Sequence, residues 1–169
     1  MMKRLLPFLL LLPVMLLRTE EPQPGLTEYL GRPIAMTMHW KGAEWLMRRV
    51  REKEESPTMM RKELRVKPGM TICDMGCGNG FHTMPLAEAV GDKGKIYAVD
   101  VQPEMITMLR ENIAKKGLKN IEPINGLFHD PKLPPNTCDM ILMVDVYHEF
   151  SHPVQMLTAM RAALKPDGL

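Results

Sequence analysis

The sequence predicts an α/β fold in which a doubly wound, mostly parallel sheet carries helices on both faces. From about residue 67 onward, short apolar segments alternate with amphipathic ones, a rhythm typical of parallel strands joined by crossover helices. A glycine-rich loop, from Asp74 to Gly80, stands between the first of these strands and the helix after it. The next strand ends on a carboxylate, Asp100.

The individual elements follow from periodicity and from start and stop signals. Ser56-Pro57 predicts a helix that begins there, with the serine as N-cap and the proline in the first turn, and ends near Leu64. Residues 103–116 predict a helix because apolar residues recur at helical spacing and Gly117 follows as a cap. The other expected elements are strands at 70–74, 95–100, 120–125 and 139–146, and helices at 42–54, 81–90 and 154–164.

Composition limits the classes of protein that fit. The 169 residues suffice for one domain, with 45% apolar and 25% charged residues. The net charge of +2 is small and the basic residues are spread along the chain, so no nucleic-acid partner is expected. The three cysteines include no CxxC pair, which argues against a disulfide framework or a zinc knuckle.

The first 18 residues resemble an export signal. A basic start, Met1 to Arg4, precedes an apolar run from Leu5 to Leu17, which is too short for a comfortable membrane span. We therefore expect an exported protein, with this segment either cleaved or kept as a membrane anchor. The alternative is an apolar helix that packs on the domain of a cytoplasmic protein. Residues 19–56 are expected to form a linker and a helical cap, and residues 57–169 the main domain.

The glycine loop and Asp100 together predict a site for a nucleoside-containing cofactor. Glycines at Gly76, Gly78 and Gly80 let the backbone turn sharply and approach a ligand closely. Asp100 ends the next strand 20 residues after Gly80, where a carboxylate can accept hydrogen bonds from the two ribose hydroxyls.

The spacing of the loop favours S-adenosylmethionine over a nicotinamide cofactor. The glycines follow GxGxG rather than the GxGxxG of pyrophosphate sites. Asp74 at the mouth of the loop would repel a pyrophosphate but suits an ammonium group. A nicotinamide-dependent oxidoreductase remains one alternative, and a non-catalytic module that binds S-adenosylmethionine is another.

These motifs resemble those of class I (Rossmann-like) S-adenosylmethionine-dependent methyltransferases, nearest to the quinone-biosynthesis type and to related exported bacterial enzymes. Asp74-x-Gly76-x-Gly78-x-Gly80 is similar to their motif I, and Leu164 to Gly168 is similar to their LKPGG turn. The resemblance covers residues 57–169 and implies a seven-stranded sheet, of which about four strands are expected here. We therefore expect either a chain truncated before the fifth strand or a short form that dimerises, and weak stability in isolation.

The resemblance also implies roles for particular residues. Asp100 would bind the ribose, while Val101 and Gln102 would border the adenine. Leu127 follows Gly126 where the family more often has an aspartate, so Asp130 is the nearest carboxylate for the adenine amino group. The methionine moiety would be held by the loop residues Asp74, Gly76, Cys77, Gly78, Asn79 and Gly80.

The expected methyl acceptor is a small molecule that meets the cofactor at the end of the fourth strand. Asp145 and His148 lie there, and either can serve as a general base for a hydroxyl acceptor. An equal alternative for Asp145 is structural or cofactor-side support. Residues 29–55 either form a lid over the acceptor or only cover the sheet.

One motif points to different chemistry. His148-Glu149-Phe150-Ser151-His152 matches HExxH, which binds zinc when both histidines share one face of a helix. Here the motif follows an apolar strand, and Pro153 disfavours a helical conformation at His152. No metal site is therefore predicted.

Overall fold

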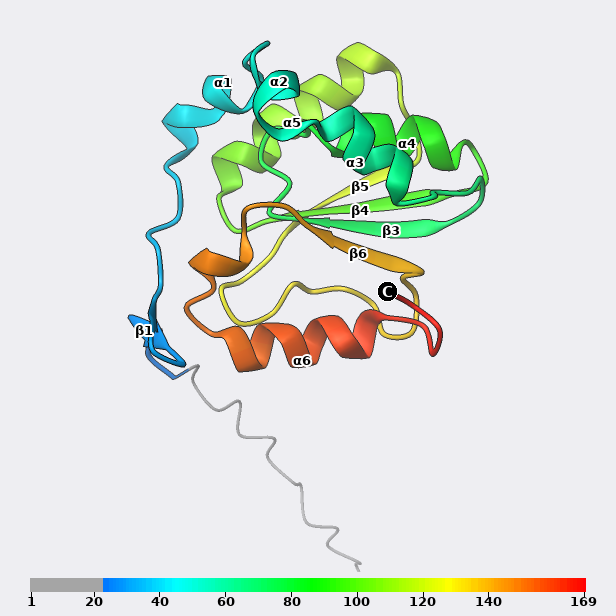
Figure 1. The fold of residues 1–169 in the computed structure, drawn as a ribbon. Helices are drawn as coiled ribbons and strands as arrows, with labels where there is room; N and C mark the ends of the chain where they lie inside the picture. The colour runs from blue at the N-terminus through cyan, green and yellow to red at the C-terminus, as the bar shows by residue number, and fades with distance from the viewer. Residues whose placement is uncertain (1–22) are drawn as a thin grey trace, which may run out of the picture.

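The computed structural model describes residues 23–169, so the predicted export segment lies outside the described residues. Its main sheet has four parallel strands in the order β5-β4-β3-β6 (Figure 1). The strands are β3 (Thr71–Met75), β4 (Lys95–Asp100), β5 (Ile121–Asn125) and β6 (Met140–Met143). The predicted parallel α/β sheet is thereby confirmed.

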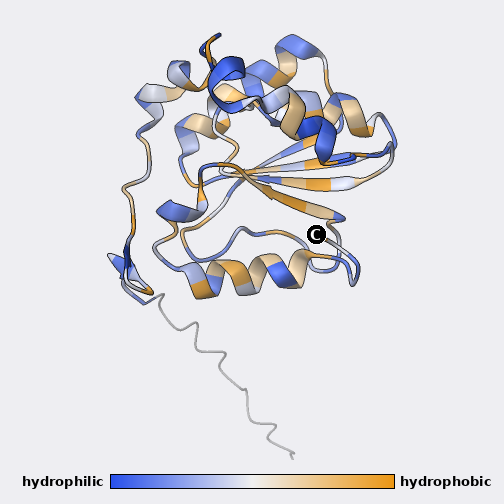
Figure 2. Ribbon diagram, viewed as in Figure 1, coloured by the Kyte–Doolittle hydropathy of each residue, from blue (hydrophilic) through white to orange (hydrophobic). Residues whose placement is uncertain are grey.

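Helices cover both faces of this sheet, as predicted. Figure 1 shows α3 (Pro57–Glu63), α4 (Thr83–Val90) and α5 (Pro103–Lys116) on one side and α6 (Pro153–Ala163) on the other. Side chains alternate along each strand, so Ile72 joins the core beneath α4 and α5 while Cys73 joins the core above α6. Figure 2 shows that β6, which lies between these layers, is hydrophobic along its length.

Most predicted elements of the main domain lie within one or two residues of their expected ends. The helix Pro103–Lys116 and its cap are as predicted, with Gly117 at a φ of 68°. The fourth strand is shorter than the predicted 139–146. It ends at Met143 because its partner strand ends there too, with Met75 paired to Met143. Asp145 then adopts a positive φ of 50°, which no strand accommodates.

The predicted helix at 42–54 is wrong. The structure has two short helices instead, α1 (Ala43–Leu46) and α2 (Arg51–Glu55). The chain can break here because Nη1 of Arg51 donates to the carbonyl of Leu46 at 3.0 Å, replacing the bond that a continuing helix would make. Arg51 is consequently buried, while Trp45 and Val50 are exposed.

Ser56 stands at the N-cap of α3, as predicted, but it does not cap the helix in the expected way. Ser56 has a φ of 49° and its side chain makes no capping hydrogen bond. It ends α2 in the left-handed conformation and passes directly into α3, so its geometry serves the turn between the two helices. Pro57 occupies the first turn of α3, as predicted.

Residues 23–46 cross the carboxyl ends of the strands. After a small hairpin, β1 (Glu28–Tyr29) and β2 (Arg32–Pro33), the chain passes through a 3-10 turn, η1 (Trp40–Gly42), into α1. We call residues 34–46 the strap. It is tied to the main domain by Trp40, whose N–H donates to Oε1 of Gln102 at 2.8 Å, and by Ala35, whose N–H donates to the carbonyl of His148 at 2.9 Å. Within residues 23–169, no helix has the length and apolar character to cross a bilayer.

Candidate cofactor site

The glycine loop turns sharply over the end of β4. The N–H groups of Gly76 and Cys77 both donate to the carbonyl of Val99, at 2.8 and 3.0 Å. Gly76 has a φ of 70°, and a Cβ added there would lie 2.4 Å from Cγ2 of Val146. A glycine is therefore required at this position by both backbone conformation and space.

Asp100 connects the glycine loop to the loop after β4. Its Oδ2 accepts the N–H of Gly78 at 3.0 Å and its Oδ1 accepts the N–H of Gln102 at 2.9 Å. Burial raises the pKa of Asp100, while these backbone donors lower it. Both loops are thus fixed around one buried carboxylate.

Asp74 is the second buried carboxylate at the strand ends. Its Oδ2 accepts the hydroxyl of Thr83, the first residue of α4, at 2.6 Å. The pKa of Asp74 is raised to about 6: burial and the charge of Asp100 raise it, and the hydrogen bond from Thr83 offsets part of this increase. A cation placed beside Asp74 would favour its charged form.

A cavity of about 320 Å³ lies between these strand ends and the strap. We call it the larger cavity, because the second cavity at these strand ends is smaller. Its lining from α1, α2 and the turn before α4 includes Trp45, Leu46, Arg51, Phe81 and His82. The structure brings the following predicted residues together in this lining: Asp74, Gly76, Cys77, Gly78, Asp100, Gln102, Asp145 and His148.

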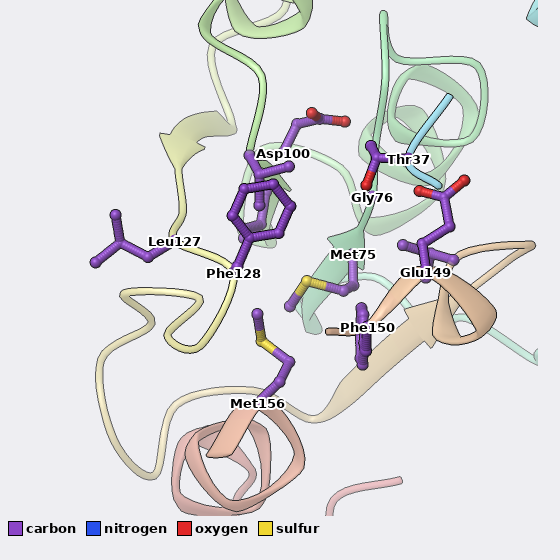
Figure 3. Close-up of a pocket in the computed structure, with 12 residues that line it drawn as sticks. Thr37, Met75, Gly76, Asp100, Leu127, Phe128, Glu149, Phe150 and Met156 are labelled. Carbon is purple, nitrogen blue, oxygen red and sulfur yellow. The ribbon is translucent and has the colours of Figure 1, made fainter. Parts of the chain in front are cut away.

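A smaller, mainly apolar cavity of about 50 Å³ adjoins the larger one. Figure 3 shows Phe128 and Leu127 on one side of it and Met75, Phe150 and Met156 below. Val101 contributes to its lining, and Gly76, Asp100 and Glu149 belong to both cavities. An apolar cavity beside Asp100 suits the flat face of a nucleobase attached to a ribose that Asp100 binds.

Three predicted residues lie outside both linings. Asp130 accepts the N–H of Lys132 at 2.8 Å through its Oδ1, and Leu127 and Phe128 occupy the cavity side of this loop. Asn79 is buried and donates from Nδ2 to the carbonyl of Ala43 at 3.1 Å, which fixes the strap to the glycine loop. A Cβ on Gly80 would lie 2.7 Å from Cδ1 of Leu109, so this glycine allows α5 to approach the loop.

Glu149 lines both cavities, although its sequence pattern indicated only the HExxH motif. Its Oε1 accepts the N–H of Met38 in the strap at 3.3 Å, and burial raises its pKa. His148 beside it is more exposed, with Nε2 at 4.0 Å from Oε1 of Glu149. The signal that could have identified Glu149 is its place directly after the end of the fourth strand, where ligand-binding residues gather in open α/β sheets.

The HExxH residues do not share a helix. The short 3-10 helix η2 (Tyr147–Glu149) ends inside the motif, and Nε2 of His152 is 2.7 Å from the carbonyl of Gln23. In the described part of the chain, no three His, Cys, Asp or Glu side chains are grouped to hold a metal ion.

The fold and this site define an α/β domain of the class I methyltransferase type. Residues 66–169 match a family model described as a methyltransferase domain. The match covers more than half of the chain, which therefore belongs to this methyltransferase domain family.

Individual relatives agree with this assignment. A crystal structure of a SAM-dependent methyltransferase from Aquifex aeolicus is 37% identical, with a TM-score of 0.73, over 77% of this chain and 69% of that one. A demethylmenaquinone methyltransferase of Geobacillus stearothermophilus is 28% identical over 64% of this chain and 46% of its own length. An arsenite methyltransferase of Halobacterium salinarum is 46% identical over 32% of this chain and 14% of its own length.

The comparisons confirm the class I methyltransferase family predicted from the glycine loop and Asp100. They also confirm S-adenosylmethionine as the cofactor of this family, in preference to the nicotinamide alternative. The chain spans less than half the length of the curated relatives described above.

Proposed function

We propose that this chain binds S-adenosylmethionine in the larger cavity and is the cofactor-binding part of an enzyme that methylates a small molecule. The observation that carries the proposal is the pair of buried carboxylates, Asp74 and Asp100, on either side of the glycine loop and lining one cavity. A pyrophosphate would meet like charges there, whereas an ammonium group and ribose hydroxyls meet acceptors.

The chain's residues mainly orient the two reactants and exclude water. S-adenosylmethionine supplies an electrophilic methyl group on a sulfonium, so alignment contributes more than acid–base help. The strap covers the strand ends and limits access of water to the larger cavity, which supports the lid interpretation of residues 29–55. Asp145 and His148 line the part of the cavity that follows β6, where either can take a proton from a hydroxyl acceptor.

The proposed acceptor is an apolar or aromatic small molecule. The relatives' names specify two acceptors, demethylmenaquinone and arsenite, of which the first is an apolar ring compound and supports this proposal. On the strap side, the lining of the larger cavity includes Met38, Trp45 and Leu46. Such a lining favours an apolar ring over a strongly charged acceptor.

A binding experiment tests the cofactor assignment. The full chain is titrated by calorimetry with S-adenosylhomocysteine and with NADH, alongside Asp100→Ala and the exposed control Asp92→Ala. We expect S-adenosylhomocysteine alone to bind, and its binding to be lost only in Asp100→Ala. Binding of NADH alone would refute the proposal. Asp130→Ala, measured in the same way, tests the predicted adenine contact, which unchanged affinity would exclude.

A transfer experiment separates an enzyme from a non-catalytic binding module. Labelled S-adenosylmethionine is incubated with the full chain and a demethylated naphthoquinone reduced to its hydroquinone, whose ring carbon can attack the methyl group and then lose its proton. Methylated product is extracted and counted. More product from the unsubstituted chain than from the double variant His148→Ala, Asp145→Ala supports catalysis by these residues. Cofactor binding without transfer to this or other small acceptors would favour the non-catalytic alternative.

We also propose that the protein is exported. The support is the basic start followed by the apolar run from Leu5 to Leu17. Cells that express the full chain are fractionated and the protein's mass is measured, with Leu9→Arg, Leu10→Arg as the comparison. A shortened exported form indicates cleavage, and a full-length membrane-bound form indicates an anchor. A full-length soluble form in the cytoplasm would contradict the proposal.

A further inference from the structure

Part of the larger cavity's lining is basic and comes from outside the strand ends. Arg51 of α2 and His82, the residue before α4, both line the cavity. They are only 5% and 7% exposed, respectively. Burying a polar side chain without hydrogen-bond partners is unfavourable, so a buried side chain with unused hydrogen-bonding groups beside a cavity points to a bound ligand.

His82 has unused hydrogen-bonding capacity. In the described part of the chain, neither of its ring nitrogens has a hydrogen-bond partner. The pKa of His82 is lowered to about 4, chiefly by burial and also by the charges of Arg51 and Arg61. At neutral pH the ring is therefore uncharged, with one N–H that can donate to a ligand.

Arg51 is held in one orientation. Its Nε donates to Oε2 of Glu55 at 2.5 Å and its Nη1 donates to the carbonyl of Leu46 at 3.0 Å. The guanidinium also lies over the ring of Phe81, 4.2 Å from the ring centroid. These contacts use Nε and Nη1, so Nη2 of this rigid, planar group can donate to a carboxylate oxygen.

The charge of Arg51 is only partly neutralised by its neighbour. Glu55 also accepts a hydrogen bond from Nη2 of Arg48 at 2.7 Å, so two guanidinium groups share this carboxylate. Arg61 adds a third guanidinium near the same ring, 5.8 Å from the centroid of Phe81. This end of the cavity therefore attracts an anionic group, while the Asp74 end attracts a cationic one.

The two kinds of group in one cavity match the amino-acid end of the cofactor, whose ammonium and carboxylate are attached to the same carbon. We propose that Arg51 and His82 bind the carboxylate of this amino-acid end, while Asp74 binds its ammonium. The inference rests on the proposed cofactor function. It assigns a binding role to two residues that lie outside the glycine loop.

The test compares two ligands that differ only at this end. S-adenosylhomocysteine carries the amino acid, and 5′-methylthioadenosine has the same nucleoside thioether without it. Both are titrated into the full chain, into Arg51→Met and into His82→Leu. Arg48→Met is the matched control, because Arg48 contacts the same Glu55 but does not line the cavity.

We expect Arg51→Met to weaken binding of S-adenosylhomocysteine about tenfold or more and to leave 5′-methylthioadenosine within about twofold. His82→Leu should show the same selectivity to a smaller extent, and Arg48→Met should show none. An equal loss of both ligands in Arg51→Met, or no loss of either, would overturn the inference and leave the proposed cofactor function intact. Failure of the unsubstituted chain to bind S-adenosylhomocysteine would overturn both.

Discussion

Replacing Gly76 with alanine tests whether the glycine loop is shaped by backbone conformation and by contact with Val146. Gly76 has a φ of +70°, and an added Cβ would lie 2.4 Å from Cγ2 and 2.9 Å from Cβ of Val146. The left-handed conformation costs an alanine about 1–2 kcal/mol. Overpacking against Val146 adds about 1–3 kcal/mol, so we expect the free energy of unfolding to fall by roughly 2–5 kcal/mol.

Gly69→Ala separates the two contributions. Gly69 has a similar φ of +87°, but a Cβ added there would meet nothing within 4 Å. Its substitution should therefore cost only the conformational part, about 1–2 kcal/mol. Urea unfolding, followed by circular dichroism, measures both variants. In a chain that already carries Val146→Ala, Gly76→Ala should lower the free energy of unfolding by less than it does in the unsubstituted chain. Equal destabilisation in Gly76→Ala and Gly69→Ala would refute the contact with Val146.

Three further predictions concern the carboxylates. Asp74 has a pKa of about 6 in the folded protein against an ordinary 3.8, so its stabilising contribution is present below about pH 4 and is lost as the pH rises through about 6. Urea titrations at several pH values should therefore show the free energy of unfolding falling by roughly 3 kcal/mol over this range, relative to the variant Asp74→Asn. Thr83→Val removes the hydroxyl that donates to Asp74. Because this hydrogen bond lowers the pKa of Asp74, the variant should ionise Asp74 at higher pH, and calorimetry should show S-adenosylhomocysteine binding beginning at higher pH than in the unsubstituted chain. Asp100→Asn replaces one of the two oxygens that accept the N–H groups of Gly78 and Gln102 with a donor, and should weaken the binding of S-adenosylhomocysteine and 5′-methylthioadenosine alike. Weaker binding of S-adenosylhomocysteine alone would contradict a contact between Asp100 and the ribose.

The strap places an N-terminal segment in the candidate site. Met38 and Trp40 bond to Glu149 and Gln102, respectively, which follow different strands of the sheet. Because these bonds join segments far apart in sequence, the larger cavity exists only in the folded domain. Residues of the strap therefore affect ligand access without belonging to the glycine loop.

The sequence by itself determined the parallel α/β architecture and the core of the cofactor site. Alternating apolar segments require burial between two helical layers, so β4 and α5 could be located to the residue. The glycine loop and Asp100 were predictable because local backbone geometry and a fixed spacing create that part of the site. The shape of the loop depends on φ angles that only glycine adopts easily.

Only the tertiary structure decided which residues complete the cavity. Arg51 lies in the segment for which the sequence predicted one continuous helix, yet the helix is broken there and Arg51 is buried because it bonds to Leu46 and stacks on Phe81. The end of β6 was set by the end of its partner strand, and Glu149 joined the site through a contact with Met38. Local sequence patterns record propensity and spacing along the chain, whereas these features depend on long-range contacts that form when distant segments pack together.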